Sequence, residues 1–200
     1  MTNALIEAIK KRRTQYALGK NLPLSVEDTT DLIKEAVRHA PSSFNSQSSR
    51  VIILFGAESE KLWSITRETL RRIVPADAFA PTNEKMKAFA AGAGTVLFFE
   101  DMDVIKGLQE KFPLYADNFP VFSEHSAGMA QFAVWSALAN AGIGASLQHY
   151  NPLIDKQVAE AWDVPSSWSL RAEMPFGSHE KPLPEKTFIE DDTRFRVFAS

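Results

Sequence analysis

One stretch of this sequence, from Ser123 to Ala141, limits the possible folds more than any other, because its helical pattern has almost no polar face. Small residues recur along one side of this helix and large apolar residues along another: Ser126, Ala130, Ala133 and Ala137, and Met129, Phe132 and Trp135. A helix that is apolar nearly all round has to be buried. It therefore lies either in the core of one subunit or between two subunits, where the small residues would let two helices approach closely.

Shorter helical patterns and apolar runs lie on both sides of this helix. The spacing of apolar residues predicts helices near 5–13, 25–39, 60–74, 84–91, 102–108 and 152–162. Apolar runs predict strands at 51–55, 95–99, 144–147 and 168–175. The stretch from Phe112 to Phe122 is aromatic without helical order, and residues 181–200 form an extended arm. With 200 residues and 44% apolar content, we expect a single domain of the α/β or α+β class.

The composition argues against several classes of function. A net charge of −3 does not favour nucleic-acid binding, which needs a basic surface. The chain has no cysteine, so disulfides and thiolate metal sites are excluded, and its histidines lack the spacing of metal ligands. No segment approaches the roughly 20 apolar residues of a membrane span. We therefore expect a cytoplasmic protein without a metal site.

Two segments near the N-terminus offer polar groups to a ligand. The loop Pro41–Arg50 contains serine hydroxyls and two side-chain amides between a helix and a strand, so it can hold a polar, planar molecule. The cationic run at residues 10–13 is followed by Thr14. Alone, this run is typical of a solvated helix end, but together with the loop it becomes a candidate phosphate site, because arginine offers a planar fork to an anion.

Other motifs of catalysis are missing. The sequence has no GxSxG elbow and no P-loop, and its paired glycines lack the third glycine of a dinucleotide-binding fingerprint. The acidic residues Glu100, Asp101 and Asp103 stand where a helix begins, which is the ordinary response to its dipole. We expect no catalytic acid or base among them.

Three motifs in order give the chain a family resemblance. Lys11–Thr14, Pro41–Gln47 and Met174–Gly177 before a lysine-bearing tail resemble the marks of the nitroreductase family of flavoprotein oxidoreductases, over essentially the whole chain. The forms Asn45–Arg50 and Leu147–Pro152 resemble a subgroup with fungal and bacterial members. The resemblance implies an α+β fold in which helices flank a central, mostly antiparallel sheet. It also implies an intertwined homodimer that holds one FMN in each of two clefts at the subunit interface.

The resemblance also implies roles for single residues. Arg12 would pair with the FMN phosphate, while Arg13 and Thr14 would reach the phosphate or the ribityl chain. Ser42, Ser43 and Asn45 would approach the cofactor from the other subunit, with Gln47 as a neighbour in that wall. Gln148 and His149 fall where the family places a backbone N–H against flavin N5, and Lys186 matches a tail lysine that reaches the phosphate.

The sequence departs from the family pattern at two positions. Tyr16 stands where many relatives have a cation near flavin N1 and O2, so that role passes to Lys85 or another cation, or is weaker here. Phe188 stands where a second phosphate-binding arginine is often found, and Arg194 or Arg196 could substitute.

The resemblance implies hydride transfer from NAD(P)H through flavin N5 to a nitroaromatic or quinone-like acceptor, in a ping-pong cycle. The aromatic stretch is our candidate for a lid over the flavin, with Phe119 and Phe122 stacking on planar substrates, although these rings could equally be core or dimer contacts. The competing hypothesis is a flavin-binding protein with a regulatory or storage role and little turnover.

Overall fold

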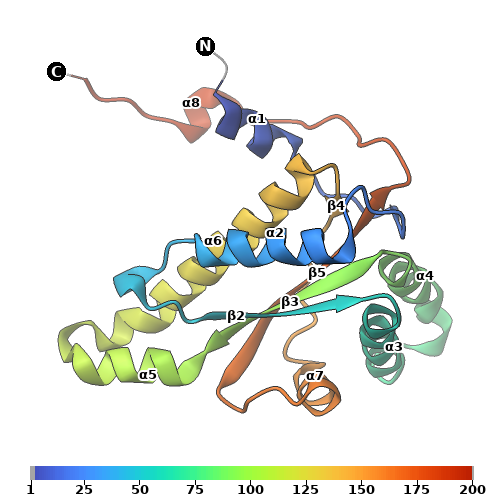
Figure 1. Ribbon diagram of the computed structural model, residues 1–200, viewed down its shortest axis with the longest axis horizontal. Helices are drawn as coiled ribbons and strands as arrows, with labels where there is room; N and C mark the ends of the chain where they lie inside the picture. Colours follow the sequence, from blue (N-terminus) through green and yellow to red (C-terminus); the bar gives the residue numbers. More distant parts are fainter. Residues whose placement is uncertain (1–2, 200) are drawn as a thin grey trace.

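An antiparallel sheet lies at the centre of the computed structural model, which describes residues 3–199 (Figure 1). Its strands are β1 (Leu18–Gly19), β2 (Ser49–Phe55), β3 (Gly94–Asp101), β4 (Gly144–Ala145) and β5 (Trp168–His179). The main order is β1-β5-β3-β2, and β4 also pairs with β5. β2 and β3 are rich in β-branched and aromatic residues, which pack well on a pleated surface.

Helices cover both faces of this sheet. They are α1 (Ala4–Lys11), α2 (Val26–Arg38), α3 (Ala57–Arg71), α4 (Phe79–Ala90), α5 (Met102–Lys111), α6 (Phe119–Asn140), α7 (Asp155–Trp162) and the short α8 (Asp191–Arg194). Single 3₁₀ segments, η1 (Ser43–Asn45), η2 (Ala76–Ala78) and η3 (Pro113–Asn118), lie between them. The antiparallel sheet flanked by helices confirms the α+β prediction.

The core divides at the sheet because side chains of a strand alternate between its two faces. From β3, Val96 and Phe98 point into a cluster with α2 and α6, whereas Leu97 and Phe99 point into a second cluster with α3, α4 and α7. Figure 1 shows α2 and α6 on one side of the sheet and α3 and α7 on the other. Within residues 3–199, none of the helices combines the length and apolar character that a membrane crossing needs.

The long helix begins earlier than predicted. The aromatic stretch is not irregular: η3 occupies residues 113–118, and α6 starts at Phe119. Pro120 fits there because the first turn of a helix needs no N–H donor from it. The small residues Ser126 and Ala130 are about 1% exposed and line a cavity with the end of α2, so this face packs inside the subunit. For these two residues the structure therefore supports the first alternative, a contact inside one subunit.

The bounds of two further elements also differ from the prediction. The helix predicted from Pro152 starts at Asp155, because residues 150–155 form turns in which the N–H of Leu153 donates to Tyr150 and that of Asp155 to Pro152. The strand predicted at 144–147 is confined to β4, and Gln148 adds one isolated bridge to Glu173. Residues 181–199 are almost all exposed and, apart from α8, have no regular secondary structure.

Candidate functional site

A cationic cavity of about 640 Å³ lies between the chain after α1 and the start of the C-terminal arm. It is lined by Arg12, Arg13, Thr14, Gln15, Tyr16, Ala17, Ala88, Lys181, Pro182, Pro184 and Lys186. Four of these residues are cations and none is acidic. The structure therefore brings five of the predicted site residues to one place that favours an anion.

The guanidinium of Arg12 stacks on the ring of Trp135. Arg12 is the C-cap of α1, and its guanidinium lies 4.4 Å from the centre of the Trp135 ring on α6. Burial and the neighbouring Arg13 lower the pKa of Arg12, and no carboxylate contributes. A guanidinium nevertheless stays charged at neutral pH. The fork of Arg12 is thus oriented by stacking, without an acidic partner among the described residues.

The arm is tied down beside Arg12 by two side chains. Arg13 donates from Nη2 to the Pro184 carbonyl oxygen at 2.7 Å. Gln15, only 4% exposed, donates to the Lys181 carbonyl oxygen at 2.7 Å and contacts His179 Nδ1 at 3.2 Å. Sequence reasoning missed Gln15, although a glutamine within the Arg-Thr motif was a visible signal. Arg13 therefore shapes the cavity wall as well as adding charge to it.

Tyr16 and Lys85 both lie near the ring of Phe89 on α4. The Tyr16 ring lies 6.4 Å from the Phe89 ring, and Lys85 Nζ lies 5.7 Å from the centre of that ring. Lys85 is exposed and stands one turn before Ala88, which lines the cavity. Lys85, the cation predicted to replace the one missing at Tyr16, therefore lies near the same ring as Tyr16.

The segment that carries Gln148 and His149 rests on Glu173. The Gln148 N–H donates to the Glu173 carbonyl oxygen at 2.8 Å, and the Glu173 N–H donates back at 3.0 Å. The Tyr150 N–H donates to Glu173 Oε2 at 2.9 Å. Gln148 is buried and His149 is exposed. Since the N–H of Gln148 is already bonded, His149 is the better of the two predicted donors to a ligand.

The loop after α2 forms a separate cavity. Ser42 and Gln47 line a space of about 210 Å³ with the end of α2 and with Ser126 of α6. Ser42 Oγ accepts from the Gln47 N–H at 2.9 Å, and Ser126 Oγ accepts from the Ser43 N–H at 3.3 Å. Asn45 ends the turn η1. This cavity shares no residue with the cationic one.

A buried carboxylate anchors the end of this loop. Glu100, fully buried at the end of β3, accepts hydrogen bonds from Ser48 at 2.5 Å, from Ser49, and from Ser123 of α6 at 2.8 Å. The interpretation of the acidic run as a helix entry is right for Asp101, which accepts from the Asp103 N–H. It misses Glu100, which joins the loop, the sheet and α6.

The predicted lid residues differ in exposure. Phe119 is 1% exposed and lies between the rings of Phe44 at 5.3 Å, Phe112 at 6.2 Å and Phe122 at 6.0 Å. As the first residue of α6 it turns into the core, so within one subunit it has no open face for a substrate. Phe122 is partly exposed, whereas Phe44 and Tyr115 are about half exposed. The accessible rings are therefore those around Phe119.

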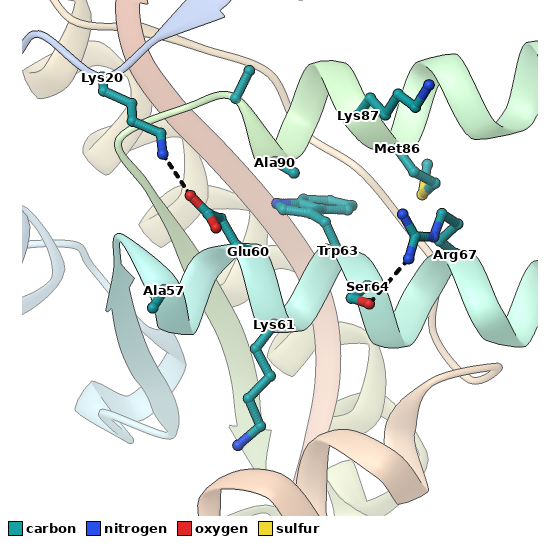
Figure 2. A pocket seen from close by; sticks show the side chains of 11 residues that line it. Lys20, Ala57, Glu60, Lys61, Trp63, Ser64, Arg67, Met86, Lys87 and Ala90 are labelled. Carbon is teal, nitrogen blue, oxygen red and sulfur yellow. Dashed lines mark hydrogen bonds and ion pairs between the residues drawn. The ribbon is translucent and has the colours of Figure 1, made fainter.

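A groove of about 590 Å³ between α3 and α4 is less suited to an anion (Figure 2). Lys20, which lines it, pairs with Glu60 at 2.5 Å, and Lys87 pairs with Glu84 at 2.8 Å. Arg67 lies 3.1 Å from Glu68. Since these cations already have carboxylate partners, the cavity at Arg12 remains the stronger candidate.

Comparisons with known proteins show the family of this chain. Residues 9–178 match the nitroreductase family. Nitroreductase CinD from Lactococcus lactis, solved in complex with chloramphenicol, is 49% identical with a TM-score of 0.90, over 98% of this chain and 100% of that chain. The same protein was also solved with 4-nitrophenol.

Two further relatives extend the similarity. HBN1 of Saccharomyces cerevisiae is 35% identical over 189 residues, which are 94% of each chain. A nitroreductase with bound FMN from Desulfitobacterium hafniense, only 15% identical, shares the fold over 100% of each chain with a TM-score of 0.72. From the family match and from relatives that span nearly its whole length, we conclude that this chain belongs to the nitroreductase family.

Proposed function

We propose that this protein is an FMN-dependent oxidoreductase that transfers hydride from NAD(P)H to nitroaromatic or quinone-like acceptors. The observation that carries the proposal is the cationic cavity in which Arg12, without a carboxylate partner, is oriented by the Trp135 ring. CinD, which was solved with two nitroaromatic compounds, supports the acceptor class.

The residues around the cavity fit FMN from end to end. The dianionic phosphate suits Arg12, Arg13 and Lys186, since a charged fork and an ammonium group both donate to phosphate oxygens. Thr14 offers a hydroxyl for the phosphate or the ribityl chain. A volume of about 640 Å³ lies within the range of cofactor pockets. We place the ring end of the flavin toward Tyr16 and the segment from residue 148 to 150.

We propose that the complete site requires two copies of this single domain. Ser42, Ser43, Asn45 and Gln47 lie apart from the cationic cavity of their own chain, so they serve the flavin of a partner subunit. The open side of α6, on which Met129 and Phe132 are about 40% exposed, is our candidate for part of the interface.

The protein's own groups bind and orient in this scheme. The flavin supplies hydride acceptance at N5, and the His149 N–H is the proposed donor to that atom. Hydride transfer needs no acid or base from the protein, so exclusion of water and alignment of the two rings carry the rate. The rings around Phe119, namely Phe44, Tyr115 and Phe122, are the proposed cover for the open face, and nicotinamide and acceptor occupy that face in turn.

Anaerobic addition of NADH or NADPH to the FMN-loaded protein tests this function. Rapid bleaching of the yellow colour, followed by its return when 4-nitrophenol or a quinone is added, is the expected result. Persistent colour would instead favour a regulatory or storage protein. Protein that remains colourless after incubation with FMN would contradict both hypotheses. Sedimentation of a stable monomer with bound FMN would contradict the two-chain site.

A further inference from the structure

The segment from Gln148 to Tyr150 rests on a buried acid, Glu173, and a second, partly exposed acid, Asp155, lies near enough for its charge to act on Glu173. Glu173 on β5 is fully buried, and the charge of Asp155 in the first turn of α7 acts on it. One oxygen of each, Glu173 Oε1 and Asp155 Oδ1, is buried without a hydrogen-bond partner in the described part of the chain. A proton on Glu173 would make its carboxyl neutral, so that the buried oxygen without a partner would carry no negative charge.

Glu173 is also the main support of the segment above it. Both backbone groups of Glu173 bond to Gln148, and its carboxylate accepts the Tyr150 N–H at 2.9 Å. The residue between them, His149, is the proposed donor to flavin N5. A change in the charge or position of the Glu173 carboxyl therefore acts directly on the backbone that carries this donor.

The surrounding charges decide which acid keeps the proton. Arg171 of β5 opposes the effect of burial on the pKa of Asp155, and it lies 2.8 Å from Glu124 of α6. Among the described residues no cation acts on the pKa of Glu173, whereas the charge of Asp155 does, and Glu173 in turn raises the pKa of the Tyr150 hydroxyl. Burial, together with the charge of Asp155, raises the pKa of Glu173 to about 7, although the hydrogen bond from the Tyr150 N–H opposes this rise. The proton therefore resides on Glu173, and it is lost near neutral pH.

We propose that Glu173 is a positioning residue whose carboxyl, neutral or charged, controls the electrostatic environment of the cofactor through the Gln148–Tyr150 backbone. With the proton in place, the segment rests on a neutral carboxyl. Without it, a buried negative charge lies behind His149 and disfavours the reduced flavin, which is the more negative form. The link to the flavin rests on the proposed function, but the proton site itself does not.

The first test needs no cofactor. Urea unfolding of the apoprotein is followed across the neutral range for the wild type, Glu173→Gln and Asp155→Asn. Glutamine imitates the protonated acid, since it is neutral and its amide oxygen can accept from the Tyr150 N–H. The free energy of unfolding of the wild type should fall as pH rises toward about 7, and Glu173→Gln should not show this fall. In Asp155→Asn the fall should be complete at a lower pH, because the charge that raises the pKa of Glu173 is gone. A wild-type profile that matches Glu173→Gln would overturn the proton site.

The second test uses the midpoint potential of the FMN-loaded protein. The midpoint potentials of the wild type and Glu173→Gln should agree at about pH 6. At about pH 8 the wild type should have the lower potential, because its preference for reduced over oxidised flavin should fall roughly tenfold. A difference between the two proteins that does not change with pH would overturn the proposal. Glu173→Ala should weaken FMN binding even at about pH 6, and Glu173→Gln should not. If no variant and no wild type takes up FMN, the proposed function fails, while the unfolding test still decides the proton site.

Discussion

Replacing Arg12 by alanine should weaken FMN binding by about ten- to a hundredfold. The guanidinium has no competing carboxylate and is stacked 4.4 Å from the Trp135 ring centre, so its fork is free and already oriented. A hydrogen bond to a charged group contributes about 1.5–3 kcal/mol, which corresponds to that loss in affinity. Arg13 cannot take over fully, because its Nη2 already donates to the Pro184 carbonyl oxygen. Arg12→Lys should lose less, since it keeps the charge without the fork.

Fluorescence titration of apoprotein with FMN measures this loss. Lys106→Ala is the matched control, because it removes the same charge from an exposed side chain on α5 that lies 3.7 Å from Asp103. Loss of the stacking on Trp135 should cost at most about 2 kcal/mol of stability in urea unfolding. Wild-type affinity in Arg12→Ala would remove Arg12 from the site. Equal losses in Arg12→Ala and Lys106→Ala would mean that net charge, and not contact with the phosphate, explains the effect.

Three further predictions concern stability. Phe119→Ala should destabilise the protein by about 3–5 kcal/mol in urea unfolding, because Phe119 is buried, whereas the half-exposed Phe44→Ala should cost much less; equal small effects would favour the lid role for Phe119. Glu100→Ala should destabilise the protein more than Glu100→Gln, because three serine hydroxyls lose their acceptor. Glu100→Ala should also make the backbone amides of residues 42–49 exchange hydrogen faster, and unchanged exchange would exclude Glu100 as the anchor of this loop. For Glu173, the pKa is raised from 4.5 to about 7 in the fold, so its contribution is complete below about pH 4.5 and is lost as pH rises through about 7, a loss of about 3 kcal/mol that Glu173→Gln should abolish.

The sequence predicted well those features that depend on neighbouring residues, such as helix starts and strands. Ser25 was expected to open the second helix, and its Oγ accepts the Asp28 N–H at 3.0 Å. The strand from Val51 was found with two residues added at its start, where Ser49 pairs with Glu100. Such signals depend on neighbours in sequence, so they can be recognised before the fold is known.

Pairings between distant segments were the parts that the sequence did not predict. Leu18–Gly19 is too short to show a strand pattern and exists as β1 only because it pairs with the end of β5. Glu100 and Glu173 stand at the end and within apolar strand patterns, where a charge is unusual. Their burial depends on which helices cover the sheet, and their partners come from residues 48–49, 123 and 150. An acid inside a buried strand was nevertheless a signal that could have been followed.

The loop after α2 has a shape that its own sequence does not favour. Phe44, Asn45 and Gln47 have φ values of 57°, 50° and 48°, in the left-handed region that costs most residues about 1 kcal/mol or more. Asparagine adopts this region readily, whereas it is unfavourable for phenylalanine and glutamine. The conformation is therefore imposed from outside: the Phe44 ring packs on Phe119, the Gln47 N–H bonds to the Ser42 hydroxyl, and Glu100 holds the following serines. A loop that is held in this way before any ligand arrives loses little entropy on binding, which suits a wall built to meet a flat cofactor.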